Sequence, residues 1–226
     1  MKKVMFFQNV TLVRMPEAIC LTTDKGNKIR ILTPLEYDAL ITQIKQDHLR
    51  TLFNVCFFTG MRYMEVQRLY ENPVWVMRER GVIYLGRDAS KKVKMKLKQR
   101  HIPIPPQLTG ELPYFFKNKK PPIRKVWWTN LKRWAREAEI GDVGITPKMT
   151  RASIESWMLI SGIPDFAVCN RQGHDRVTQL NHYMGLPFTR AEVIEIKSRL
   201  AGWNWQDWVD ETATKSIWVA ERKSNE

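Results

Sequence analysis

The first 33 residues carry short runs of apolar and β-branched residues separated by polar ones, a spacing typical of strands. Four such runs read VMFF, VTLV, AICLTT and KIRILT, and the turn-forming stretch DKGN joins the last two. We therefore expect a β-rich segment over residues 1–33.

From residue 34 onward the apolar positions recur at the period of a helix. Thr33 and Pro34 form a helix start, with threonine as the N-cap and proline at the first helical position. A second helix is expected over residues 49–58, and a third from about residue 61. The sequence across the break between them reads FFTGMRYME, which places Arg62 at the start of the third helix.

Residues 82–104 have a different pattern from the helices before them. VIYL and RHIPIP are typical of strands, and SKKVKMKLKQR lies between them. At the two-residue period of a strand, five of its cations share one side. One interpretation is an edge strand that lysines protect from aggregation. Five cations in register favour a long basic hairpin that follows a nucleic-acid backbone, and the residues expected to contact it are Lys92, Lys94, Lys96, Lys98 and Arg100.

The remainder of the chain is mainly helical in pattern. Residues 113–122, PYFFKNKKPP, are expected to form a proline-bounded basic loop. Strands, helices, a hairpin and more helices, in this order, predict an α+β fold that is mainly helical, with a small antiparallel sheet. The later helical patterns occupy residues 126–140, 146–163, 164–173 and 175–185, and two more follow residue 189.

The net charge of the chain indicates the kind of molecule that it binds. The chain has 226 residues, with 37 Lys and Arg against 23 Asp and Glu, and a formal net charge of +14. In a folded domain this excess favours a polyanion, nucleic acid above all, although a basic surface can also serve solubility alone. Three distant cysteines favour a reduced, cytoplasmic protein over a disulfide framework or a zinc site. No apolar stretch approaches the roughly 18 residues of a membrane span, so we expect no membrane association.

Two arginine motifs are candidates for anion binding. Arg62 allows three interpretations: a surface charge, an ion pair with Glu65, or a clamp for a phosphate. In TPKMTR, we expect Thr146 to cap a helix, so that Lys148 and Arg151 share a face of its first turns. Two cations there oppose the helix dipole unless an anion is present. They are either tolerated surface charges or part of a phosphate site.

Two further residues are uninformative when each is taken alone. His174 follows Gly173 on a short connection, where a side chain can face a cleft, and Tyr183 lies near the end of the next helix. A tyrosine in that position is more often a packing residue. His174 and His182 lack the spacing of a helical metal pair and no acidic cluster accompanies them, so we expect neither a metal nor a cofactor.

Taken in order, these motifs resemble the catalytic domain of the tyrosine recombinase, or phage integrase, family. The family pattern is an arginine after a Thr-Gly turn, a hairpin lysine, His-x-x-Arg, Gly-His and a nucleophilic tyrosine. Arg62, Arg151, His174 and Tyr183 match it, with 23 residues from Arg151 to His174 and nine from His174 to Tyr183. The resemblance covers about residues 34–190. It leaves a β-rich extension over 1–33 and a helical tail over 191–226, for packing or oligomer contacts.

Lys148 departs from the family pattern, because it stands where the first histidine of His-x-x-Arg is usual. In this it is similar to integrases of archaeal viruses and plasmids, and type IB topoisomerases can also carry lysine there. An ammonium has no lone pair with which to accept a proton, so we expect Lys148 to stabilise charge.

The hairpin lysine, which is the family's general acid, has several candidates. Counting forward from the first strand reaches Lys91 or Lys92. Counting back from the second strand reaches Met95, between Lys94 and Lys96. Our assignment is Lys91.

The resemblance implies metal-free phosphoryl transfer on double-stranded DNA. Tyr183 would attack a phosphodiester to give a covalent 3′-phosphotyrosine and a free 5′-hydroxyl, with Arg62 and Arg151 as bidentate donors to the phosphate. His174 would bind the same phosphate or assist proton transfer, and Glu65 would orient the segment that bears Arg62. A homo-oligomer on DNA, a dimer or tetramer, is implied as well. It would be a monomer in free solution, in the cytoplasm, that of a host cell if the source is viral.

Two alternatives share much of this pattern. A type IB-like DNA topoisomerase uses the same tyrosine chemistry but relaxes DNA without exchanging strands, and the spacing from Arg151 to His174 favours a recombinase. A non-cleaving DNA-binding relative would lack a member of the catalytic set, whereas every member is present here. The leading hypothesis is therefore a site-specific DNA recombinase.

Overall fold

The computed structural model describes residues 17–23, 26–86, 99–173 and 186–206. Within them, no helix is both long enough and apolar enough to cross a membrane. The α-helices are α1 (Pro34–Gln43), α2 (Asp47–Thr59), α3 (Tyr63–Glu71), α4 (Glu111–Lys117), α5 (Arg124–Glu137), α6 (Met149–Ile160), α7 (Asp165–Gln172) and α9 (Arg190–Arg199). Short 3-10 helices are η1 (Pro73–Trp75), η2 (Arg78–Arg80) and η4 (Pro106–Leu108). The strands are β1 (Cys20–Thr22), β2 (Lys28–Arg30), β3 (Val76–Met77), β4 (Val82–Leu85) and β5 (Arg100–Pro103).

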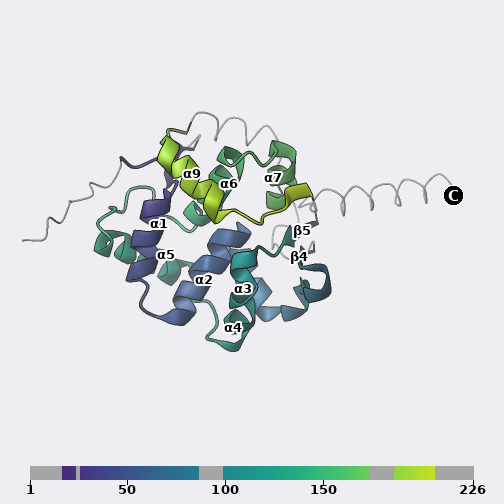
Figure 1. Ribbon diagram of the computed structural model, residues 1–226. Helices are drawn as coiled ribbons and strands as arrows, with labels where there is room; N and C mark the ends of the chain where they lie inside the picture. Colours follow the sequence, from purple (N-terminus) through teal and green to yellow (C-terminus); the bar gives the residue numbers. More distant parts are fainter. Residues whose placement is uncertain (1–16, 24–25, 87–98, 174–185, 207–226) are drawn as a thin grey trace, which may run out of the picture.

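Helix α2 runs through the middle of the molecule (Figure 1). Residues 51–59 of this helix are buried except for the partly buried Asn54, whereas Asp47 and Arg50 near its start are exposed, so its later part is enclosed by the rest of the fold. It packs against α6 on one side and α4 on another, and α1 packs against α5. Phe57 of α2 meets Trp157 of α6 edge to face, with ring centroids 4.9 Å apart, and both side chains are fully buried. The predicted α+β fold, mainly helical, is confirmed.

Two small antiparallel sheets complete the fold. β1 pairs with β2, with Leu21 opposite Ile29, and the order of the other sheet is β3-β4-β5. The two strands expected around the basic hairpin pair as β4 and β5, with Leu85 opposite Arg100, while residues 87–98 lie outside the described part. Of the four strand-like runs near the N-terminus, the last two contribute β1 and β2; the first two also lie outside it.

The segment after β2 connects the small sheet to α6. The Leu32 N–H donates to Ser153 Oγ at 2.8 Å, and the Trp157 indole N–H donates to the Leu32 carbonyl at 2.8 Å. Thr33 then caps α1 as predicted, since its hydroxyl accepts the Glu36 N–H at 3.2 Å.

Two element boundaries differ from the prediction. Residues 111–117 form α4, although residues 113–122 are expected to be a loop. Pro113 is compatible with the first turn, because an N–H there has no partner within the helix, and Leu112 and Phe115 bury their side chains. The other difference is at α6, which begins at Met149 rather than at Pro147, with Lys148 as its N-cap.

The described part of the chain beyond residue 190 packs onto the rest of the molecule. Thr189 caps α9, and Ile196, Leu200 and Trp203 are buried in the common core. Nη1 and Nη2 of Arg199 donate to the Asp38 carboxylate, at 2.8 and 2.6 Å. This segment therefore shares a core with the helices that precede it.

Candidate active site

The break between α2 and α3 places Arg62 at the start of a helix. α2 ends at Gly60, whose φ of 64° lies in the left-handed region that glycine adopts without steric cost. The Thr59 hydroxyl donates to the Val55 carbonyl and accepts the Met61 N–H at 3.2 Å. Arg62 follows as the N-cap of α3, with 44% of its side chain exposed.

Glu65, in the first turn of α3, holds Arg62 in place. Its Oε2 accepts the backbone N–H of Arg62 at 2.7 Å, and its Oε1 accepts Nη1 of the same residue at 3.0 Å. Oε2 also accepts Nη2 of Arg100, from β5, at 2.7 Å. Glu65 and Arg100 are both buried. One buried carboxylate therefore orders two arginines, one exposed and one buried.

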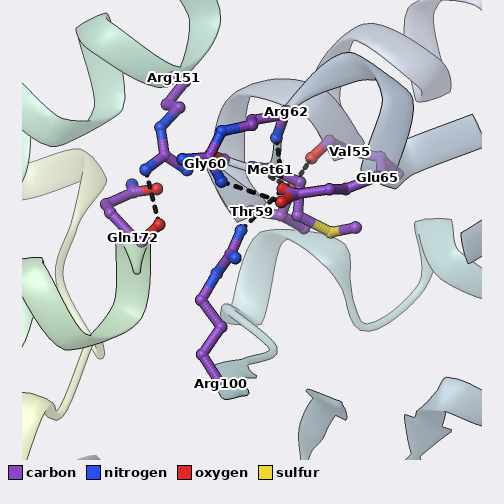
Figure 2. Close-up of polar contacts among 9 residues, drawn as sticks. All are labelled: Val55, Thr59, Gly60, Met61, Arg62, Glu65, Arg100, Arg151 and Gln172. Atoms are coloured by element: carbon purple, nitrogen blue, oxygen red, sulfur yellow. Dashed lines mark hydrogen bonds and ion pairs between the residues drawn. The ribbon is translucent and has the colours of Figure 1, made fainter. Parts of the chain in front are cut away.

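Arg151 of α6 approaches this pair from another side, so that three guanidinium groups converge (Figure 2). Its Nη1 donates to the Gly60 carbonyl at 2.9 Å and its Nη2 to the Gln172 carbonyl at 2.6 Å. These carbonyls lie at the C-terminal ends of α2 and α7, where the helix dipole favours a cation. Arg151 is thereby fixed by backbone groups of two helices distant in sequence.

Two glycines allow the close approach of these elements. A Cβ atom at Gly60 would lie 2.2 Å from Nε2 of Gln172, and one at Gly173 would lie 2.9 Å from Cδ of Arg100. Gly173 ends α7 with a φ of 69°. Neither position has room for a side chain unless a neighbour moves.

Positive charge exceeds negative charge around Glu65. Burial, and then the charge of Arg62, lower the pKa of Arg151 to about 10, against the opposing effect of Glu155. Burial alone would raise the pKa of Glu65, but the charges of Arg100 and Arg62 outweigh it and lower that pKa. An anion bound beside Arg62 and Arg151 would reduce the repulsion between the guanidinium groups.

Lys148 is exposed at the N-terminus of α6, three residues before Arg151. Its backbone N–H donates to Oγ1 of Thr146 at 3.2 Å. The prediction that Thr146 caps this helix is therefore wrong: Lys148 is the N-cap, and the Thr146 hydroxyl accepts a hydrogen bond in the turn before α6. Lys148, as the N-cap, and Arg151, as the third residue of α6, both lie at the start of this helix, as the TPKMTR motif predicts.

Several of the predicted site residues lie outside the described residues. They are Lys91, Lys92, Lys94, Lys96, Lys98, His174 and Tyr183. Arg100 is described, and its placement corrects the expectation that it joins the hairpin lysines on a DNA-facing side. Its side chain is only 5% exposed, because the guanidinium turns inward to the Glu65 carboxylate.

Arg171 is a neighbour of the site that the sequence did not single out. Its Nη2 donates to the Phe58 carbonyl at 2.7 Å and its Nη1 to the Pro103 carbonyl at 2.9 Å, and its guanidinium lies over the Trp203 ring, 4.9 Å from the centroid. Burial, and then the charge of Arg100, lower its pKa to about 9. Its position two residues before Gly173 is the only sequence signal that could have pointed to it.

The chemistry of this arrangement is that of an anion site. Arg62 offers a half-exposed guanidinium, whereas Arg151 and Arg100 are fixed on backbone or carboxylate oxygens. Planar guanidinium groups match the oxygens of a phosphate. Among the described residues, no three His, Cys, Asp or Glu side chains are grouped so as to hold a metal ion.

Comparison with known protein families identifies the family of this chain. Residues 30–190 match the model of the phage integrase family. The chain belongs to the phage integrase family. A search among individually curated proteins found no match. Integrases of this kind are tyrosine recombinases, which cut and rejoin DNA, and the match spans α1 through α7, with Arg62 and Arg151 inside it.

Proposed function

We propose that this integrase is a site-specific DNA recombinase that cuts and rejoins double-stranded DNA through a 3′-phosphotyrosine on Tyr183. The observation that carries the proposal is the convergence of Arg62 and Arg151 from α3 and α6, each held by contacts that leave the pair net positive. Such a pair suits the charge that spreads over the equatorial oxygens of a phosphodiester in its transition state.

The proposed reaction balances without a metal. The Tyr183 oxygen forms a bond to phosphorus while the bond from phosphorus to the 5′-oxygen breaks, and the bond energy is kept in the phosphotyrosine. Arg62 and Arg151 bind the non-bridging oxygens. His174 binds the same phosphate or accepts the tyrosine proton, which otherwise passes to water. Lys91, as general acid, gives a proton to the 5′-oxygen, and Lys148 stabilises charge from the start of α6. The 5′-hydroxyl of a partner strand then reverses the step.

A basic surface beside the site supports DNA as the substrate. Residues 112–136 hold eight Lys and Arg and no Asp or Glu, and most of these cations are exposed. Helix α3 fixes the loop within this segment, since Tyr63 Oη and Gln67 Nε2 donate to the Pro122 carbonyl at 2.7 and 2.8 Å. The surface and Arg62 are therefore attached to one helix, and polyanion binding of this kind follows the backbone of DNA.

Further parts of the proposal rest on the family resemblance. The hairpin lysines Lys92, Lys94, Lys96 and Lys98 contact the DNA backbone. The enzyme assembles as a dimer or tetramer on its attachment site and is a monomer free in solution. With Lys-x-x-Arg at 148–151, it belongs with the integrases of archaeal viruses or plasmids and acts in the cytoplasm of the host cell.

The experiment that tests the proposal is Tyr183→Phe with a nicked suicide substrate bearing the attachment site. The unmodified enzyme should form a covalent protein–DNA adduct, and Tyr183→Phe should form none. Tyr114→Phe is a matched control, because Tyr114 is an exposed tyrosine on α4. An adduct that persists in Tyr183→Phe contradicts the assignment of the nucleophile.

A second assay separates recombination from relaxation. Supercoiled DNA with two attachment sites should yield joined products as well as relaxed circles. Relaxation without joining of the two sites would contradict a recombinase and favour the topoisomerase alternative.

A further inference from the structure

Arg100 is buried between elements that contribute to the site, although its sequence position predicts a surface cation. It is the first residue of β5, and its side chain is as inaccessible as that of Glu65. Burial lowers its pKa, and the Glu65 charge opposes that effect. A buried guanidinium is costly unless it is paired and hydrogen-bonded, so this placement depends on Glu65.

The contact between Arg100 and Glu65 continues to Arg62. Arg100 Nη2 donates to Oε2 of Glu65, the oxygen that also accepts the Arg62 backbone N–H, and both bonds are 2.7 Å long. The other carboxylate oxygen accepts Arg62 Nη1. Both oxygens of the Glu65 carboxylate therefore contact Arg62, and one of them also contacts Arg100 from β5 (Figure 2).

The stem of Arg100 makes a second contact, with the end of α7. A Cβ at Gly173 would lie 2.9 Å from Cδ and 3.1 Å from Nη1 of Arg100, so the two residues are in close contact. The preceding residue, Gln172, supplies the carbonyl that accepts Arg151 Nη2 at 2.6 Å. Arg100 thus touches both the carboxylate that orients Arg62 and the helix end that anchors Arg151.

We infer that Arg100 is a positioning residue of the phosphate site: through Glu65 and Gly173 it fixes the mutual geometry of Arg62 and Arg151. The inference rests on the proposed function, because the anion is taken to be the DNA phosphate. It contrasts with a purely structural ion pair, which would affect folding but not the geometry of the two phosphate-binding arginines.

The decisive variant is Arg100→Met, which keeps the stem and removes the guanidinium. In single-turnover assays with the suicide substrate, we expect the cleavage rate constant to fall by about 10- to 100-fold, the range for lost positioning. Affinity for the DNA should change less than about twofold, because it sums many contacts with the DNA backbone, of which the phosphate site is one. Arg100→Lys, which keeps the charge but not the fork of donors, should be intermediate.

Arg30→Met is the matched control. Arg30 is also a buried strand arginine paired with a glutamate at a helix start, but its partner is Glu36 of α1. We expect comparable loss of stability in Arg30→Met and Arg100→Met, and normal cleavage per folded molecule only in Arg30→Met. If Arg100→Met does not fold, the comparison of Arg100→Lys with Arg30→Lys replaces it.

Two readouts separate positioning from stability. In a double-mutant cycle with Glu65→Gln, the Arg100→Met effect on cleavage should largely disappear, since Arg100 acts through Glu65. The groups that face Glu65 are Arg62 from α3, Arg100 from β5 and Arg151 from α6. Loss of Arg100 should therefore move the acid limb of the plot of cleavage rate against pH to higher pH. Loss of Arg30 from its ion pair with Glu36 should not.

Cleavage at the unmodified rate by folded Arg100→Met would overturn the inference. So would a double mutant in which the separate effects of Arg100→Met and Glu65→Gln on the cleavage rate simply multiply. Inorganic phosphate provides a readout that does not depend on cleavage. Arg100→Met should weaken phosphate binding, measured by calorimetry, even if no adduct forms with any protein. A missing Tyr183-dependent adduct in the unmodified enzyme would therefore defeat the proposed function, whereas unchanged phosphate affinity in Arg100→Met would defeat the positioning role.

Discussion

The starts of α1 and α3 share a buried glutamate and a buried arginine from a strand, but their N-cap residues differ. In each, a buried glutamate three residues into the helix start accepts the N-cap backbone N–H, Glu36 from Thr33 at 3.1 Å and Glu65 from Arg62 at 2.7 Å. In each, a buried arginine from a strand pairs with that glutamate, Arg30 of β2 or Arg100 of β5.

The residue that differs is the N-cap. At α1 it is Thr33, which is fully buried and whose hydroxyl accepts the Glu36 N–H. At α3 it is Arg62, whose side chain has no acceptor for a backbone N–H of the first turn. It extends, half-exposed, toward Arg151 instead. The pair at α1 is neutral, whereas the group at α3 carries surplus positive charge. The same kind of helix start is therefore a closed structural unit at α1 and, under the proposed function, an anion site at α3.

The largest expected loss of stability comes from breaking the ion pairs of Glu36 with Arg30 and of Glu65 with Arg100. Glu36→Gln and Glu65→Gln should each lower the free energy of unfolding by about 3–5 kcal/mol, because each leaves a buried arginine without its charge partner. Only Glu65→Gln should also slow cleavage per folded molecule. Urea denaturation and single-turnover cleavage measure the two properties. Equal cleavage in both variants would show that the two helix starts do not differ in function.

Exchange of the N-cap tests the difference directly. Arg62→Thr gives α3 the cap of α1, and we expect cleavage to fall by about 100- to 1000-fold, as when one oxyanion donor is lost. Stability should be unchanged or higher by about 1 kcal/mol, since threonine caps a helix.

Arg62→Lys tests geometry at constant charge. It should fold normally and still lose most cleavage, because lysine lacks the bidentate fork of donors. Adduct formation measures the loss. A rate near that of the unmodified enzyme would contradict the role of Arg62 as a phosphate clamp.

Acid pH should affect the α3 start through Glu65. Its pKa lies below the ordinary value of 4.5, since Arg100 and Arg62 outweigh the effect of burial. The unfolded chain therefore takes up this proton first, so the stability from Glu65 is complete above about pH 4.5 and is lost as the pH falls through the lower folded pKa. Unfolding free energies measured downward from about pH 6 should show a steeper loss in the unmodified enzyme than in Glu65→Gln. Parallel curves would contradict this.

The smallest expected effect is stabilisation by an anion. Inorganic phosphate at about ten times its Kd should raise Tm by about 3 °C, because it binds the folded state only. Arg62→Thr should abolish the shift and Arg30→Met should keep it, since Arg30 is paired and buried away from solvent. Differential scanning calorimetry measures the shift, and an equal shift in Arg62→Thr would place the anion elsewhere.

Local signals in the sequence predict much of the fold. Thr33 and Pro34 begin α1 where expected, and Gly60 and Gly173 end α2 and α7 in the left-handed conformation. These features depend only on residues within a turn of each other. The same holds for Arg62, whose place at a helix start follows from the break before it.

Contacts between distant residues explain what the sequence could not predict. Alternation puts Arg100 on one side with the lysines, but does not reveal that this end of the strand faces Glu65, 35 residues away. Arg151 is likewise anchored on the Gly60 carbonyl across 91 residues. The helix at 111–117 depends on burial of Leu112 and Phe115, which the prolines and lysines nearby obscure.

The contact between Gly60 and Gln172 constrains how this integrase can vary in sequence. The Gln172 side chain is fully buried, and its amide nitrogen occupies the space that a Cβ at position 60 would need. A larger residue at position 60 must displace Gln172, whose carbonyl anchors Arg151. A substitution at the end of α2 therefore changes the position of Arg151 indirectly. Shortening residue 172 restores the space but not the positive φ at 60. We therefore expect substitutions at positions 60 and 172 to depend on each other, and glycine at position 60 to tolerate replacement least.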